Sequence, residues 1–339
     1  MGGDGAPRVL VVSARGARLR VHRGAIVVES VDGGGRSRSV VPIAEVDRIV
    51  IVTSQVSITS SAVRRLARLG IDILFLDARG NPVVTLTPPW VSRTSETRIA
   101  QYRAATDPSS RLAVAKSIVY GKMLNQAGFL RSLALERGEA WLRDEAERIE
   151  EYARRALGED SVDRLRVLEA HAARRYWGAL AALLPGDVGF QGRNHDSPDP
   201  MNTILNYLYA LLYAWVHRYL VMYGLDPYVG FIHADRSGRP TLVYDFAELF
   251  RVSAVDRLAY KLLAGGWRPV RDPQTGLMDA ETRSRLVAEY ARWVRERVVR
   301  DGATGKSDTL ERHMARHARL LAQAVRSGSM YAPFREAVR

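Results

Sequence analysis

The hydrophobic pattern of this 339-residue chain changes once, near residue 90, and this change limits the folds that the chain can adopt. Before it, short runs rich in β-branched residues alternate with turn residues, as is typical of strands joined by tight turns. After it, apolar residues recur at three- and four-residue steps, which is the period of helices with one buried face. The sequence therefore predicts an α+β fold, in which a small N-terminal β-sandwich-like domain precedes a larger all-α domain.

Short apolar runs predict the strands of the first domain, namely RVLVVS, ARLRVHR, AIVVES, VDRIVIV, DILFLD and PVVTLTP. One helix, SSAVRRLARLG, interrupts them, with Ser60 or Ser61 as its N-cap and Gly70 at its C-terminal end. We expect a small sandwich or rolled sheet over residues 1–90. The stretch TPPWVSRTSETR, with two prolines, then indicates a linker over 91–105, which leaves 106–339 for the helices.

The composition excludes several classes of protein. The chain has no cysteine, which excludes disulfides, zinc fingers and thiol catalysis. Its start lacks the basic and apolar regions of a secretory signal. The longest apolar run, ILNYLYALLYAWV, is too short to cross a bilayer and predicts a buried helix. We therefore expect a cytoplasmic protein with no membrane partner.

The formal net charge of +13 favours an anionic partner. Only four of the 50 basic residues are lysine, and guanidinium groups suit bidentate contacts with phosphate. From Thr282 to the end, 13 basic residues face 6 acidic ones. Basic helical surfaces attract nucleic acid, although many are simply solvated, so charge alone favours nucleic acid only slightly. The excess of arginine and the scarcity of Asn and Gln also fit a heat-loving source, weakly.

Glu169 lies on the apolar face of a predicted helix, level with Leu165 and Leu168. A buried carboxylate is costly unless it is protonated, paired with a cation or bound to a metal. Pairing with Arg166 or Arg174 is the ordinary outcome for such a residue.

Three more polar residues lie beside apolar segments, in GFIHADRSGRPTLVYDFAELF. Asp245 and Glu248 fit a capping box at a helix start, and His233 fits a core histidine bonded to a carbonyl. Together with the carboxylate of the preceding helix, however, they form a mixed oxygen and nitrogen set that suits Mg²⁺ or Mn²⁺ with phosphate. Arg236 and Arg239, on the loop between them, could meet a DNA backbone.

The histidines of ERHMARH, His313 and His317, have the i, i+4 spacing of some metal sites. No glutamate lies between them as in a zinc protease, so we expect an exposed basic helix that could touch DNA. His195, in GRNHDSPDP, is expected in a loop.

Several segments, in order along nearly the whole chain, resemble the CRISPR-associated integrase-endonuclease of spacer acquisition. VPIAEVDRIVIVTSQVSITSSAVRRLARLGIDILFLDARGNPV is similar to its β domain, and RIAQYRAATDPSSRLAVAKSIVYGKMLNQAGFL to its first helices. LEAHAARRYW, PDPMNTILNYLYALL, GLDPYVGFIH and LVYDFAELFR resemble its active-site segments, and TLERHMARHARLLAQAV with YAPF resembles its C-terminal helix. One departure is FRVSAVD, where many members have a proline after the arginine.

The resemblance implies a metal-dependent DNA endonuclease and integrase, with Glu169, His233 and Glu248 as ligands of Mg²⁺ or Mn²⁺ and Asp245 close by. Such an enzyme inserts short DNA fragments into a CRISPR array, through attack of a 3′-hydroxyl on a phosphodiester, and cleaves or resolves branched DNA. The implied partners are double-stranded and branched DNA, a second copy joined through the β domains, and a small companion adaptation subunit. The all-α domain is then the catalytic one.

Two other classes of function remain open at this point. A nuclease that only hydrolyses branched DNA or RNA would use the same three ligands. A non-enzymatic nucleic-acid-binding scaffold would use Asp245 and Glu248 as a helix cap and Glu169 as an arginine partner. The chain also has no cysteine and no G-x-S-x-G turn, so a covalent protein–DNA intermediate has little support.

Overall fold

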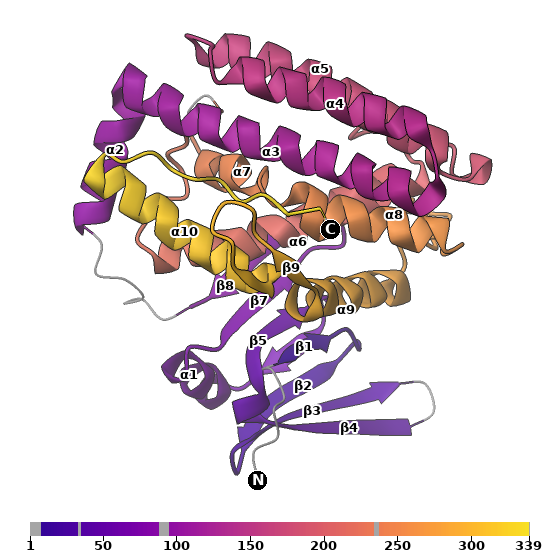
Figure 1. Cartoon of the computed structure of the whole chain (residues 1–339). Coiled ribbons are helices and arrows are strands. Elements are labelled where there is room, and N and C mark those ends of the chain that lie inside the picture. The colour runs from indigo at the N-terminus through magenta and orange to yellow at the C-terminus, as the bar shows by residue number, and fades with distance from the viewer. Residues whose placement is uncertain (1–7, 33–34, 88–94, 234–236, 339) are drawn as a thin grey trace. The chain divides into compact units, whose positions relative to one another are not determined.

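The computed structural model describes residues 8–32, 35–87, 95–233 and 237–338 (Figure 1). Its contacts divide the chain into two compact units, which we describe separately. The first comprises Met1–Val91 and Pro269–Arg292, and the second comprises Ser92–Arg268 and Trp293–Arg339.

The first unit contains two four-stranded sheets. In one sheet the strand order is β1-β5-β7-β8, with β8 the only antiparallel neighbour among its described pairings. In the other the order is β4-β3-β2-β6, antiparallel except that β6 runs parallel to β2. The strands are β1 (Arg8–Val12), β2 (Ala17–His22), β3 (Ala25–Asp32), β4 (Gly35–Pro42), β5 (Val46–Ile51), β6 (Val56–Ile58), β7 (Asp72–Leu76) and β8 (Pro82–Leu86).

Both sheets and helix α1 (Ser60–Arg68) contribute to one apolar core. Leu19 and Ile26 come from the second sheet, Ile49 and Ile73 from the first, and Leu66 from the helix. The sandwich-like β domain that the sequence predicts is thus confirmed, and each of the six predicted runs is a strand. Strands β4 and β6 were not predicted, because β4 is polar and mostly exposed and β6 has only three residues.

The predicted cap of α1 is wrong by one position. Thr59, and neither Ser60 nor Ser61, lies outside the helix and accepts a hydrogen bond from the Ala62 amide. Gly70 follows the helix with φ +72°, a conformation that suits glycine, so the predicted C-terminal end is correct.

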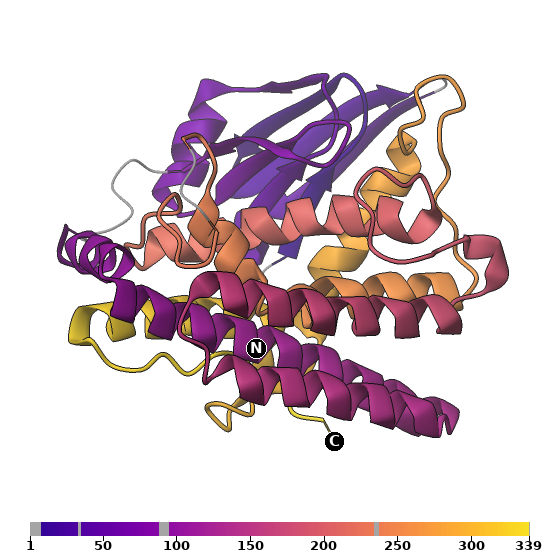
Figure 2. The ribbon, with the colours of Figure 1, turned by 90° about the horizontal axis from the view of Figure 1, so that it is seen from above.

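The second unit is mainly helical, which confirms the predicted larger all-α part. Helices α3, α4 and α5 lie side by side, as the purple and magenta ribbons of Figures 1 and 2 show. The run predicted as a buried helix forms part of α6 and is buried along its length. The helices are α2 (Ser95–Thr106), α3 (Pro108–Arg137), α4 (Ala140–Ala156), α5 (Val162–Leu183), α6 (Pro200–Met222), α7 (Thr241–Ala247), α8 (Arg257–Ala264) and α10 (Leu310–Ser327).

Helix α2 begins inside the segment predicted as a linker, 91–105, and residues 88–94 lie outside the described ranges. Helix α9 (Ala280–Glu296) crosses the division between the units, and the short antiparallel strands β9 (Val298–Arg300) and β10 (Ser307–Thr309) precede α10. Short 3₁₀ turns occupy Ile43–Glu45 and Gly186–Val188. Between α7 and α8, residues Arg251–Asp256 form a π-helical turn, a feature frequent at functional sites.

Asn125, buried in the middle of α3, connects distant segments of this unit. Its amide nitrogen donates to the carbonyl oxygens of Leu249 (2.9 Å) and Phe334 (3.2 Å), and its oxygen accepts from the Glu336 amide (2.8 Å). One side chain therefore ties the central helix to the end of α7 and to the C-terminal segment.

Among the described residues, no helix combines the length and the apolar character that a membrane span requires.

Candidate metal-binding and catalytic site

Glu169 pairs with a lysine that the sequence did not indicate. It lies on α5, whose N-cap is Ser161, and its Oε1 contacts the ammonium of Lys122 on α3. Arg166, one of the two expected partners, instead donates to the carbonyl of Ile232 (2.6 Å). The expected arginine pairing is therefore wrong, because α3 packs directly against α5 and brings a cation closer.

Glu248 is the C-cap residue of α7 and is buried. Its Oε2 lies 2.7 Å from the same Lys122 ammonium, and its Oε1 lies 2.5 Å from Arg251. Burial would raise the pKa of Glu248, but the charges of Arg251 and Lys122 lower it overall. The two carboxylates, from α5 and the end of α7, thus converge on one cation.

Asp245 lies inside α7 and is not its N-cap, so the capping-box interpretation is wrong. Its carboxylate is fully buried, and Oδ2 accepts from the amides of Phe231 (2.6 Å) and Ile232 (2.8 Å). Oδ1 accepts from the amide of His233 (3.2 Å) and lies 2.5 Å from Nδ1 of its ring. Asp245 therefore holds both the backbone and the ring of His233.

The carbonyl oxygens of the same segment are held by arginines. Arg111 on α3 donates to the carbonyls of Phe231 (3.1 Å) and His233 (3.3 Å), and Arg166 holds the carbonyl between them. The His233 side chain is 46% exposed, so the expectation of a core histidine is wrong. The hydrogen bond to Asp245 raises the pKa of His233, and its Nδ1 contact leaves Nε2 available for a ligand.

The oxygen and nitrogen donors of Glu169, Glu248 and His233 are of the chemical types that a hard divalent cation binds. Two carboxylates and one imidazole are a set that Mg²⁺ or Mn²⁺ accepts when water or phosphate completes the shell. Glu169 and Glu248 already share one cation, and the charges of both carboxylates add to the larger effect of the Asp245 hydrogen bond in raising the pKa of His233. Glu169, His233 and Glu248 are not among the groups in the described parts of the chain whose ligand atoms all lie within 4.8 Å of one another.

A cavity of about 100 Å³ adjoins the carboxylate pair. Three cationic side chains line it, Lys122, Arg193 and Arg251, with the rings of Tyr209 and Tyr213 beside the guanidinium of Arg251. We call it the cationic cavity. It holds more positive than negative charge, because Asp256 is the only acidic residue on its described wall.

Asp256 is buried, and its oxygens accept hydrogen bonds from Tyr176 (2.9 Å) and Tyr209 (2.6 Å). Burial raises the pKa of Asp256 to about 6, against the effect of these bonds. The carboxyl is therefore less acidic than an exposed aspartate, and it compensates the three cations less strongly.

The structure describes only one of the two loop arginines that were expected to contact DNA. Arg236 lies outside the described residues, and Arg239 is exposed in the irregular segment just before α7. His195 lies in a turn, as expected, with Nδ1 3.0 Å from the Asn206 side chain.

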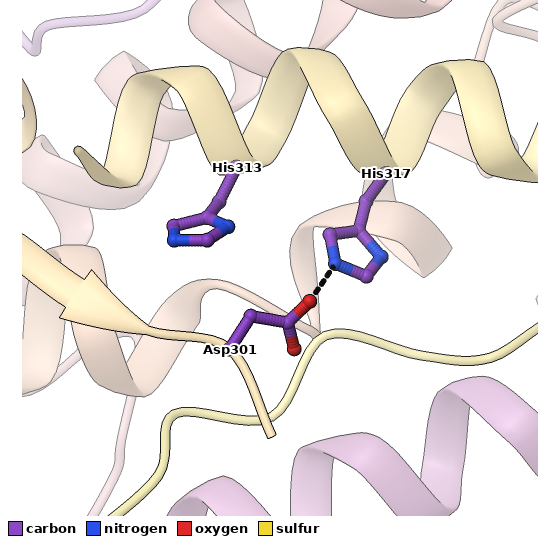
Figure 3. A group of neighbouring side chains, drawn as sticks. All are labelled: Asp301, His313 and His317. Atoms are coloured by element: carbon purple, nitrogen blue, oxygen red, sulfur yellow. Dashed lines mark hydrogen bonds and ion pairs between the residues drawn. The ribbon is translucent and has the colours of Figure 1, made fainter. Parts of the chain in front are cut away.

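The expectation for His313 and His317 is wrong, since both are fully buried. With Asp301 they form the group of histidine and acidic residues in the described chain whose ligand atoms all lie within 4.8 Å of one another (Figure 3). Each ring nitrogen already has a partner. His313 contacts the Val299 carbonyl and the Arg316 guanidinium, and His317 contacts Asp301 (3.0 Å) and the Tyr331 hydroxyl (3.2 Å).

Asp301 is equally occupied, because it also accepts hydrogen bonds from Thr304 and from the amides of Ala303 and Arg335. A guanidinium on one imidazole and a full set of partners argue for a structural network rather than a metal site. We call Asp301, His313 and His317 the buried triad. Both histidines lie on the buried face of the amphipathic helix α10. Their i, i+4 spacing in the sequence does not indicate which face of the helix is buried.

Several basic residues of the C-terminal segment form ion pairs. Arg295 contacts Glu311 (2.6 Å), Arg316 contacts Asp308 (2.7 Å), and Arg297 contacts Glu336. Much of the acidic content of this segment is therefore used in internal ion pairs.

Comparison with known proteins agrees with the resemblance. The family model described as "CRISPR associated protein Cas1" matches residues 10–292. A protein of Hyperthermus butylicus named CRISPR-associated endonuclease Cas1 is 37% identical over 335 residues, covering 97% of this chain and 98% of the relative. Among solved structures, a casposase bound to integration product has TM-score 0.80 at 23% identity, covering 96% of this chain and 93% of that one.

A further solved structure, a Cas6-RT-Cas1–Cas2 complex, has TM-score 0.74 at 19% identity and covers 98% of this chain and 36% of that chain. These structural likenesses show a shared fold. The family model spans most of the chain, and the Hyperthermus relative is similar over its whole length, so this chain belongs to the family of CRISPR-associated protein Cas1.

Proposed function

We propose that this protein is a metal-dependent DNA endonuclease and integrase that joins a 3′-hydroxyl end to a target phosphodiester. One observation carries the proposal: Glu169 and Glu248, from distant elements, converge on a single cationic position, that of the Lys122 ammonium. Side chains that are far apart in sequence and share one such position are what a site for Mg²⁺ or Mn²⁺ needs.

In this proposal Glu169, Glu248 and Nε2 of His233 are the metal ligands, and Asp245 is a positioning residue. Asp245 fixes the ring of His233 through Nδ1, as carboxylates commonly do when they accept a hydrogen bond from a metal-binding histidine. A bound cation would neutralise the charge that develops on the phosphate oxygens. Arg239 and Arg236 are proposed to meet the DNA backbone outside the site.

The reaction proposed is a direct displacement. The bond between the incoming 3′-oxygen and phosphorus forms while the bond from phosphorus to the target 3′-oxygen breaks. The attacking hydroxyl loses its proton and the leaving oxygen takes one up, so no oxidant is required. When water replaces the hydroxyl, the same site hydrolyses the strand, and when branched DNA is the substrate, the reverse reaction resolves it.

The proposal also covers the domains of the chain and its oligomeric assembly. We propose that residues 1–90 form a dimerisation domain, that 106–339 form the catalytic domain, and that a small companion subunit joins two such dimers. The exposed edge strand β4 and the complex of Cas1 with Cas2 in a protein of the same fold support this proposal. The casposase of the same fold, bound to integration product, supports DNA as the substrate.

The decisive test is strand transfer on a supercoiled plasmid, with a labelled DNA donor and with or without Mn²⁺. We expect metal-dependent joining that requires a 3′-hydroxyl and is lost in Glu169→Gln, while a 3′-dideoxy donor gives no joined product. Cleavage without joining would favour the purely hydrolytic nuclease. DNA binding without either reaction would favour the scaffold, whose capping box of Asp245 and Glu248 is absent from α7.

A further inference from the structure

Lys122 occupies an unusual position for a lysine. Its side chain is 12% exposed, and its ammonium lies between Glu169 Oε1 and Glu248 Oε2, the latter at 2.7 Å. A second cation, Arg251, holds the other oxygen of Glu248 at 2.5 Å. The two carboxylates are thus already neutralised by two side-chain cations of the protein.

This neutrality conflicts with the binding of a divalent ion. Two further positive charges beside Lys122 and Arg251 would leave an excess of two, in a region where charges are poorly screened. Lys122 and a divalent ion also need the same carboxylate oxygens. They cannot occupy the position together.

The cationic cavity offers the displaced ammonium another place. Lys122 lines this cavity as well as the carboxylate pair, and its flexible four-carbon stem allows the ammonium to turn from one to the other. There it would lie with Arg193 and with Arg251, which stays paired with Glu248. The cationic side chains of the cavity would then outnumber its one buried acid and would attract an anion.

We propose that Lys122 is an exchangeable counter-ion, which fills the cation position of the carboxylate pair until a divalent ion displaces it and which then binds a phosphate of the DNA in the cationic cavity. This inference rests on the proposed metal site. It assigns the cavity a ligand class, the phosphate group, and it makes metal and DNA binding cooperative. The cooperativity must be reciprocal, because each ligand changes the affinity for the other by the same factor.

The first experiment measures Mn²⁺ binding to the full chain without DNA, by the loss of the electron paramagnetic resonance signal of free Mn²⁺. Lys122→Gln removes the competing charge, and we expect it to bind Mn²⁺ on the order of tenfold more tightly than the natural protein. Lys116→Gln is the matched control, because it removes the same charge from the same helix, and its affinity should not change.

Two more variants keep the test decisive. Glu169→Gln should weaken Mn²⁺ binding, and if it does not, the proposed metal site is wrong. If Glu169→Gln weakens binding while Lys122→Gln leaves the affinity unchanged or lower, the metal site stands and the counter-ion role is wrong. Lys122→Arg keeps the charge and should bind Mn²⁺ no more tightly than the natural protein, which separates loss of charge from a change in packing.

The second experiment measures the affinity for a fluorescein-labelled DNA duplex by anisotropy, with and without Mn²⁺. The natural protein should gain affinity when Mn²⁺ is present, and Lys122→Gln should gain less, because the ammonium that would bind phosphate is missing. An equal gain in both proteins would overturn the assignment of the cationic cavity to phosphate.

Discussion

Replacing Asp245 by asparagine should separate the positioning of His233 from the stability of the fold. An asparagine has nearly the same shape but only one acceptor oxygen. If its NH₂ group took the place of Oδ2, the buried amides of Phe231 and Ile232 would both lose their acceptor, at about 1–3 kcal/mol each. The NH₂ group therefore turns toward His233, where a single backbone amide loses its bond at 3.2 Å.

This orientation of the asparagine amide changes which ring nitrogen of His233 carries the hydrogen. In the neutral ring, Asp245 accepts from Nδ1–H and leaves Nε2 free of hydrogen, whereas the NH₂ group of asparagine would donate to Nδ1 and force the hydrogen onto Nε2. A protonated Nε2 cannot bind a metal. We therefore expect a loss of stability of about 1–3 kcal/mol, but a loss of Mn²⁺ affinity or strand transfer of about 10- to 100-fold.

The assay combines three measurements on Asp245→Asn: thermal unfolding, Mn²⁺ titration, and ¹⁵N spectra of the imidazole, which distinguish the two tautomers. Asp226→Asn is the control, because Asp226 also accepts an amide hydrogen bond, from Tyr228, just before the same segment. Unchanged Mn²⁺ affinity in Asp245→Asn, with the hydrogen found on Nε2, would refute the role of this nitrogen. Unchanged affinity with the hydrogen on Nδ1 would refute the orientation argument.

The remaining predictions concern packing, pH and assembly. Gly230→Ala would place a Cβ 2.5 Å from Oδ2 of Asp245, so unfolding should become easier by about 1–3 kcal/mol in thermal melts, whereas Gly186→Ala, with open space around it, should melt like the natural protein. Burial lowers the pKa of His313, so stability should fall as the pH drops below the ordinary value of 6.5; in urea titrations His313→Gln should show a shallower fall, and an equal slope would count against this explanation. Light scattering at micromolar concentration should give the mass of two chains, and a monomer there would contradict the proposed homodimer.

The sequence predicts the two-part architecture because each part has a clear period. Alternating β-branched runs and helical apolar stripes both follow from burial of one face, and burial is what the fold must satisfy. Strand β4 escapes this argument, since GRSRSVVP pairs along an exposed edge and buries almost nothing. Its existence depends on hydrogen bonds to β3, which leave no hydrophobic pattern.

Within the candidate site, the sequence indicates which residues are out of place but not what they touch. Glu169 stands out as a carboxylate on an apolar face, yet its partner Lys122 lies 47 residues earlier and is fixed by the packing of α3 on α5. The same limit explains the error for Asp245, where a local capping pattern competed with a contact to the preceding loop. Only tertiary packing decides between such alternatives.

Asn125 links the proposed metal site to a C-terminal segment that supplies none of the proposed ligands. Its oxygen and amide bind Glu336 and Phe334, and the same amide binds Leu249, the neighbour of Glu248. A chain without residues 334–336 would have all the proposed ligands but would leave this buried side chain without two of its partners. The C-terminal segment should thus stabilise the chain next to Glu248 from a distance, and its loss should weaken the proposed metal site while most of the helices remain folded. A chain stopped at residue 330 should retain most of its helix content, but should bind Mn²⁺ more weakly than the full chain.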